Sequence, residues 1–153
     1  MIAKLDVRIV HLGPLHVVAA TGYGEHPEDE AWEIILAFAR EHGLEPWSGR
    51  HRFFGFNHPS PPECPPEPGS EYGYEQWMTV DGSVDVEAPL ELKEVVGGQY
   101  AVTHCTGLEN ISGMWRELAD WVTDHGYEWA PGVIEGLEEV LTPIDTPLDE
   151  WEI

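Results

Sequence analysis

Two segments carry apolar residues at helical spacing, and each is followed by a glycine. Residues 27–42 begin with Pro27 and a run of acidic residues, which suit the first turn and the positive end of the helix dipole. Gly43 and Gly126 follow residues 27–42 and 112–125 and favour helix ends there. The apolar faces consist of Ala31, Ile34, Ile35 and Phe38 in the first segment, and of Met114, Trp115, Leu118, Trp121 and Val122 in the second. We therefore predict two helices.

Strand-like segments follow each predicted helix. Residues 52–56 and 72–80 are rich in aromatic residues, which favour strands. Residues 133–141 and 150–153 are the strand candidates in the second half of the chain. Residues 57–69 are rich in proline, which cannot donate a hydrogen bond to a sheet, so we predict an extended loop there.

The two halves of the chain resemble each other. A shift of 83 positions places Trp32 on Trp115 and His42 on His125, and a Thr-Gly pair precedes each helix. We interpret this as an internal duplication within a single domain over 1–153, with repeats over about 1–82 and about 83–153. Each repeat then has the order strand, helix, strand, strand, which predicts an α+β fold with an antiparallel sheet.

The charge of the chain excludes several partners. The 153 residues include 29 acidic and 7 basic ones, which gives a formal charge of −22. So few basic residues do not support binding to nucleic acid phosphates, and an anionic membrane surface would repel the chain. No run of about 18 apolar residues is present to span a bilayer. We expect a cytoplasmic protein without direct nucleic acid or membrane binding, and the oligomeric state stays open.

The histidines and cysteines do not indicate a metal site. The eight histidines lack short ligand spacings, and neither Cys64 nor Cys105 belongs to a Cys-x-x-Cys unit. His42 and His125 precede the glycines that end the helices, where a ring suits the negative end of the dipole. We predict no metal and no cofactor.

Two glutamates stand among aromatic residues in the predicted strands. The strand period of two puts Glu75 on the same face as Trp77 and opposite Tyr74. Glu138 aligns with Glu75 in the second half, so a pseudo-two-fold relation would bring both into one central cleft. A carboxylate among aromatic rings suits a cationic ligand. The alternative is that both glutamates point to solvent from edge strands.

Three runs of the sequence resemble the GyrI-like family of small-molecule effector-binding domains. They are FGFNHP at 54–59, YGYEQW at 72–77 and LEEVL at 137–141. The resemblance covers nearly the whole chain and implies a duplicated β-α-β-β module of the SHS2 type. Two main helices and a curved antiparallel sheet would surround a central ligand cleft. Relatives also occur fused to transcription activators of the MerR and AraC types, whereas we expect this chain to be a stand-alone member.

The resemblance also implies a set of ligand-binding residues. By motif position Glu138 would contact cationic ligands, with Glu75 as its counterpart in the first module. We expect the aromatic walls to come from Tyr74, Trp77, Phe54, Trp115 and Tyr100. Val140 stands where relatives commonly have tyrosine, and we expect the last strand to be short.

The sequence leaves three functions open. The first is binding and sequestration of lipophilic, often cationic, aromatic small molecules, as in multidrug binding. The second is a hydrolase that opens cyclopropane-bearing DNA-alkylating compounds, with Glu75 and Glu138 as catalytic acid and base in unassigned order. The third is an acidic protein–protein module that modulates DNA gyrase. The natural ligand is not indicated.

Overall fold

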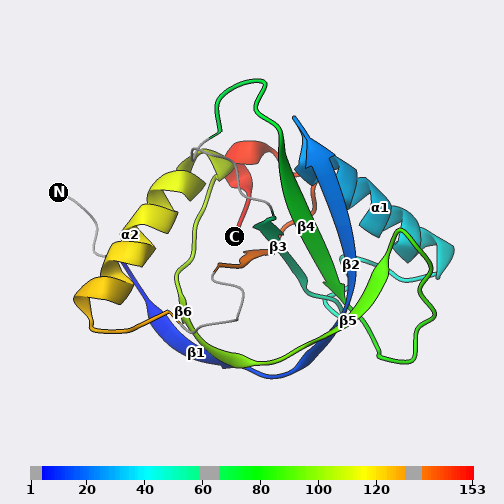
Figure 1. The fold of residues 1–153 in the computed structure, drawn as a ribbon, viewed down its shortest axis with the longest axis horizontal. Coiled ribbons are helices and arrows are strands. Elements are labelled where there is room, and N and C mark those ends of the chain that lie inside the picture. Colours follow the sequence, from blue (N-terminus) through cyan, green and yellow to red (C-terminus); the bar gives the residue numbers. More distant parts are fainter. Residues whose placement is uncertain (1–4, 59–65, 130–135) are drawn as a thin grey trace.

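The computed structural model describes residues 5–58, 66–129 and 136–153, and it is an α+β protein (Figure 1). Both helices and two strands are close to their predicted bounds. The elements in chain order are β1 (Arg8–Leu12), β2 (Leu15–Gly24), α1 (Pro27–Glu41), β3 (Phe53–Asn57), β4 (Tyr72–Thr79), β5 (Glu91–Val95), β6 (Gly98–Val102), η1 (Leu108–Asn110), α2 (Ile111–Asp124), β7 (Glu138–Val140) and η2 (Leu148–Glu150).

The structure confirms that the helices end at the predicted glycines, each preceded by a histidine. Gly43 and Gly126 have φ angles of +65° and +78°, a left-handed conformation that glycine adopts without strain. The Nδ1 atoms of His42 and His125 lie 3.0 Å and 2.8 Å from the carbonyl oxygens four residues earlier. Each ring therefore contacts a carbonyl group that already accepts a hydrogen bond from the backbone N–H of the same histidine.

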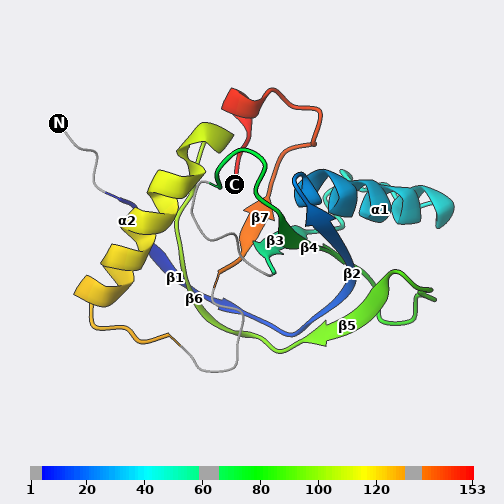
Figure 2. The ribbon, with the colours of Figure 1, turned by 45° about the horizontal axis from the view of Figure 1, so that its top comes forward.

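An antiparallel sheet connects the two halves. Its five strands have the order β5-β2-β4-β3-β7, while β1 and β6 form a separate pair. Because β1 runs into β2 and β5 into β6, the two pairings form one long curved ribbon (Figure 2). At its bend, a Cβ on Gly97 would overlap the Leu12 carbonyl group, so the close approach of the two chains requires glycine there. Neither β1 nor β5 was among the predicted strands.

The order of elements corrects the predicted alignment of the two repeats. β7 follows α2 as β3 follows α1, so β7 corresponds to β3 and not to β4. Thr106 pairs with Glu152 in the same way as Thr21 pairs with Glu75. The counterpart of Glu75 by strand pairing is therefore Glu152, and the predicted alignment of Glu138 with Glu75 is wrong.

The ends of the predicted strands and loop differ from the structure in part. β7 covers only Glu138–Val140 of the predicted strand over 133–141, of which residues 133–135 lie outside the described residues. The predicted strand over 150–153 is reduced to residues that follow η2 and pair with 105–107 through the backbone. Most of the predicted proline-rich loop, including Cys64, lies outside the described residues.

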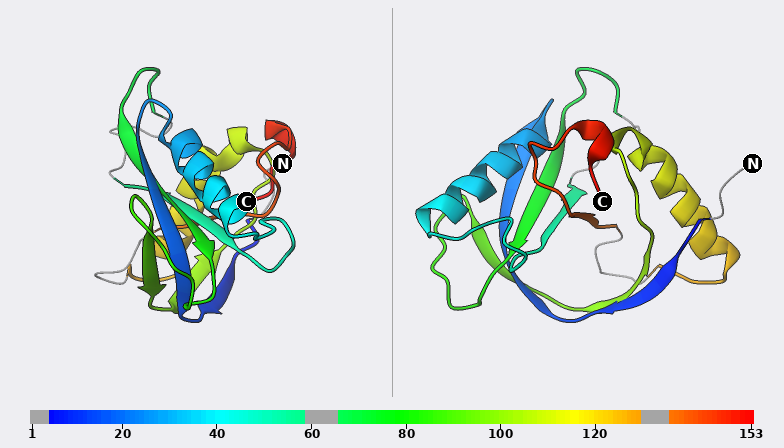
Figure 3. Two further views of the ribbon diagram at one scale, coloured as in Figure 1. Left: turned by 90° about the vertical axis from the view of Figure 1, so that its right-hand side faces the viewer. Right: turned by 180° about the vertical axis from the view of Figure 1, so that it is seen from behind.

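The central strands are buried on both faces. One face packs against α1 and contains Val18, Phe53 and Met78, together with Ile35 of the helix (Figure 3). The opposite face contains Val17, Ala19, Phe54 and Trp77 beside Leu12. β4 is buried along almost its whole length for this reason, which explains why it lacks a simple polar–apolar alternation.

In the part of the chain that the structure describes, no helix is long and apolar enough to cross a membrane.

Candidate functional site

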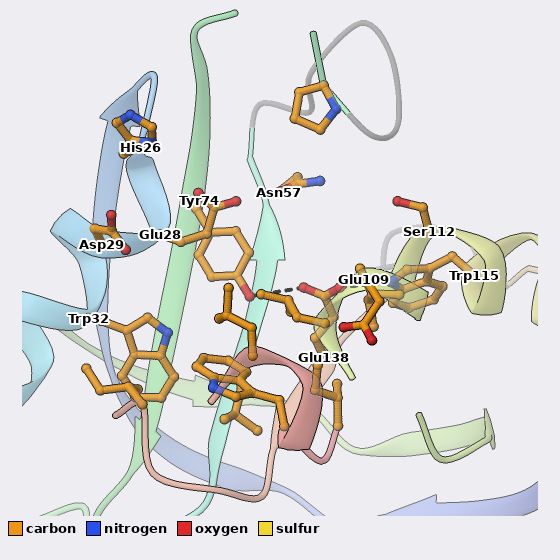
Figure 4. A pocket seen from close by; sticks show the side chains of 18 of the residues that line it. His26, Glu28, Asp29, Trp32, Asn57, Tyr74, Glu109, Ser112, Trp115 and Glu138 are labelled. Atoms are coloured by element: carbon orange, nitrogen blue, oxygen red, sulfur yellow. Dashed lines mark hydrogen bonds between the residues drawn. The ribbon is translucent and has the colours of Figure 1, made fainter. Parts of the chain in front are cut away.

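A pocket of about 1210 Å³ lies between the two helices (Figure 4). Its walls come from α1 between Glu28 and Arg40, from η1 and the start of α2, from β4 and β7, and from the C-terminal segment. The aromatic and acidic side chains of the lining include Glu28, Trp32, Tyr72, Tyr74, Glu109, Trp115, Glu138 and Trp151. The volume exceeds the roughly 300–1000 Å³ of common small-molecule sites, so bulky ligands fit.

Glu138 lies at the centre of a hydrogen-bonded group in this pocket. The Tyr74 hydroxyl donates to Glu138 Oε1 at 3.1 Å, and Trp115 Nε1 donates to Glu138 Oε2 at 2.9 Å. The three side chains come from β4, α2 and β7, which are far apart in the sequence. Both carboxylate oxygens are thus directed by an aromatic donor, as Figure 4 shows.

Two glycines make room for the rings that hold Glu138. β3 lies between β4 and β7, so Tyr74 must cross it to reach Glu138. It crosses at Gly55, where a Cβ would overlap the Tyr74 ring and hydroxyl. At Gly136 a Cβ would lie 2.7 Å from the edge of the Trp115 indole. Neither glycine has a local sequence signal, because the requirement for glycine comes from a ring on another strand or helix.

The surroundings of Glu138 make its ionised form less favourable than it is in water. Burial raises the pKa of Glu138, and the hydrogen bonds from Trp115 and Tyr74 counteract this only in part. Burial and the adjacent Glu138 charge raise the pKa of Tyr74 well above its usual value, so its hydroxyl stays a donor. A cation placed beside Glu138 would restore the ionised carboxylate.

A second carboxylate of the pocket is held in a similar way. Glu28 of the first turn of α1 accepts a hydrogen bond from the Tyr72 hydroxyl at 2.5 Å. Burial and Glu28 raise the pKa of Tyr72, which keeps this phenol protonated as well. The sequence showed Glu28 only as one of several acids that complement the helix dipole.

The structure brings three of the seven predicted ligand-binding residues together. Tyr74, Trp115 and Glu138 line this pocket. The others lie at the opposite face of the sheet, where Phe54 and Trp77 are buried and Tyr100 packs against them; Glu75 is on this face too. The assignment of all seven to ligand contacts stays a prediction.

Glu75 has partners of its own on that opposite face. It is 6% exposed, accepts a hydrogen bond from Trp77 Nε1 at 2.5 Å and forms an ion pair with Lys93 Nζ at 3.1 Å. The prediction that Glu75 shares a face with Trp77 is therefore confirmed. The burial of Glu75 also rules out the alternative that both glutamates point to solvent.

The expected meeting of Glu75 and Glu138 in one cleft is wrong. Glu138 pairs with Gly55, which in turn pairs with Gln76, so Glu138 and Gln76 share a face. Glu75 is the neighbour of Gln76 in the same strand and points to the other face. The acid–base pair on which the hydrolase alternative depends is therefore not assembled at this pocket.

Among the described residues, no group of three His, Cys, Asp or Glu side chains is placed to hold a metal ion.

Solved structures with the same fold include effector-binding proteins. The EcmrR C-terminal domain has a TM-score of 0.70 at 11% identity, covering 98% of this chain and 94% of that one. EcmrR in a complex with DNA has a TM-score of 0.73 at 14% identity; the match covers 96% of this chain, which spans only 54% of that relative. SAV2435 bound to tetraphenylphosphonium has a TM-score of 0.55 at 14% identity, covering 97% and 90%.

A hydrolase from Listeria innocua has the same fold, with a TM-score of 0.65 at 11% identity and coverage of 97% and 89%. No curated protein matches the sequence significantly. At the level of sequence, the family model for Cass2, the integron-associated effector binding protein, matches residues 8–151. The chain therefore belongs to the integron-associated effector binding protein family, one of the GyrI-like families.

Proposed function

We propose that this protein binds and sequesters lipophilic aromatic cations in the pocket between α1 and α2, with Glu138 as the counter-charge. The observation that carries the proposal is the placement of Glu138 between two aromatic donors, Tyr74 and Trp115, in a large pocket. Both donors orient the carboxylate without neutralising it.

The pocket supplies what an aromatic cation needs. Burial raises the pKa of Glu138 because it disfavours the ionised carboxylate, which a neighbouring cation would stabilise. In the described part of the chain, none of the ion pairs involves Glu138. A ligand cation would supply the missing charge, and the rings of Trp115 and Tyr74 would add cation–π attraction and apolar contact.

The comparison with solved structures is consistent with this class of ligand. SAV2435 has the same fold and was solved with tetraphenylphosphonium, a lipophilic cation with four phenyl rings. Membership of an effector-binding family supports small-molecule binding in general terms. Transfer of the cationic class to this chain is our proposal and rests on Glu138.

The test is a calorimetric titration with tetraphenylphosphonium and with triphenylphosphine oxide, an uncharged aromatic compound of related shape. We expect the wild type to prefer the cation, and Glu138→Gln to lose about tenfold in affinity for it, which corresponds to about 1.4 kcal/mol. Affinity for the neutral compound should change little, because the Gln side chain preserves the shape of the pocket.

Glu139→Gln is the matched control. It makes the same change of charge one residue away, in a side chain that pairs with Arg52 rather than lining the pocket. We expect it to bind tetraphenylphosphonium as the wild type does. Equal affinities of wild type and Glu138→Gln for the cation would reject the role of Glu138.

A further inference from the structure

We propose that the pocket is suited to aromatic dications, with Glu28 meeting the second positive charge. This inference rests on the proposed function and extends it, since Glu138 would meet the first charge. Glu28 and Glu138 are seen on the two sides of the Tyr74 ring in Figure 4.

Two neighbouring phenols of one strand hold the two carboxylates. Tyr72 donates to Glu28 and Tyr74 donates to Glu138. Both tyrosines line the pocket and stand two positions apart on β4, so their Cα atoms are separated by roughly 7 Å along the strand. The two phenols thus bring one carboxylate from α1 and one from β7 to the same face of β4.

The helix dipole alone does not account for Glu28. An acid in the first turn of α1 is favourable there, but Asp29 and Glu30 in the same turn serve that purpose as well. Glu28 differs from both because the Tyr72 hydroxyl directs its carboxylate. The negative charge of Glu28 also raises the pKa of Glu138, so the two carboxylates interact electrostatically.

The pocket lining carries more negative than positive charges, so it can accept a ligand with two positive charges. The described lining includes two guanidinium groups, on Arg40 and Arg116, and five carboxylates, on Glu28, Asp29, Glu33, Glu109 and Glu138. The ion pairs of the described residues all lie elsewhere, at Arg52, Lys93 and His104. No lysine or arginine thus pairs with Glu28 or Glu138 within the described structure.

Two carboxylates held by neighbouring phenols of one strand favour a compact dication. A bipyridinium carries its two charged nitrogens at opposite ends of two joined rings, and its flat surface suits Trp115 and the phenols. Methyl viologen is such a compound. N-methyl-4-phenylpyridinium has nearly the same shape but a single charge, so the two probes differ chiefly in the charge that Glu28 would meet.

The experiment compares both probes by calorimetric titration against wild type, Glu28→Gln, Glu138→Gln and the control Glu87→Gln. Glu87 is exposed and outside the pocket, so it reports the effect of net charge alone. We expect the wild type and Glu87→Gln to bind methyl viologen about tenfold more tightly than the monocation. Glu28→Gln should lose this preference while its affinity for the monocation stays within about twofold.

The results separate this inference from the proposed function. Glu138→Gln should weaken binding of both probes; unchanged binding of both would reject the proposed function. Equal affinity of the wild type for the two probes would overturn the dication inference even if tetraphenylphosphonium binds well, and this comparison needs no variant. A parallel loss of both probes in Glu28→Gln would overturn it too, since Glu28 would then act on the pocket as a whole.

Discussion

The protonation of buried Glu138 makes the stability of the fold depend on pH. Burial raises its pKa, while Trp115 and Tyr74 donate hydrogen bonds that stabilise the ionised form in part. The folded chain therefore binds the Glu138 proton more tightly than the unfolded chain does. A group of this kind contributes most to stability below its unfolded pKa, and the contribution is lost as the pH rises through its folded pKa.

We therefore expect the unfolding free energy of the wild type to fall relative to that of Glu138→Gln as the pH rises from about 4.3, the ordinary pKa of a glutamate, through the raised pKa of Glu138 in the folded chain. The glutamine cannot ionise and so lacks this dependence. Urea denaturation of both proteins across the range measures the difference. Parallel stability curves would show that the pKa of Glu138 is the same in the folded and unfolded chains.

The space above Gly55 of β3 allows a side chain of β4 to reach β7 on the other side of β3. Tyr74 on β4 reaches Glu138 on β7 only because Gly55 leaves space on the strand between them. Tyr74 is therefore positioned by β3, although β3 contributes no side chain at Gly55. The role of β3 follows from the strand order, not from its own sequence.

Gly55→Ala should lower the unfolding free energy by about 1–3 kcal/mol, because the added methyl group overlaps the Tyr74 ring. Combining it with Tyr74→Ala should cost less than the sum of the two single changes. Gly98→Ala in β6 is the control, since open space surrounds its Cβ position. Denaturant titrations measure the four variants against the wild type. Strict additivity would contradict the proposed contact.

The C-terminal segment forms a wall of the pocket between α1 and α2. Trp151 is buried, donates a hydrogen bond from Nε1 to the Thr146 carbonyl at 2.8 Å and accepts one from the Gly107 backbone at 2.8 Å. Figure 1 shows η2 and the C-terminus between the starting ends of α1 and α2. Residues at the end of the chain thus connect the core around α1 with the segment that leads into α2.

Trp151→Ala should lower the unfolding free energy by about 3 kcal/mol and should weaken tetraphenylphosphonium binding, because it removes a pocket wall together with part of the core. Trp129→Ala is the matched control, since Trp129 is 48% exposed and does not line the pocket. Thermal unfolding with and without the cation measures both effects. Full binding by a folded Trp151→Ala protein would exclude Trp151 from the site.

Three of the five side chains that form the hydrogen-bonded groups of Glu138 and Glu28 could be predicted from the sequence, and two could not. The aromatic and acidic motifs pointed to Tyr74, Trp115 and Glu138, which do lie together. Glu28 was hidden among the acids of a helix start, and Tyr72 had no local signal beyond its strand. Strands β1 and β5 were missed because their pairing partners are distant in sequence.

The sequence by itself determined the helices, their ends and the main strands of the first half, because periodicity and capping act over a few residues. It also placed Glu75 and Trp77 on one face through the period of two. Only the tertiary structure decided which face meets the pocket. A shift of one position along a strand turns a side chain to the other face, and that position depends on pairings such as Gly55 with Glu138, which no local pattern specifies.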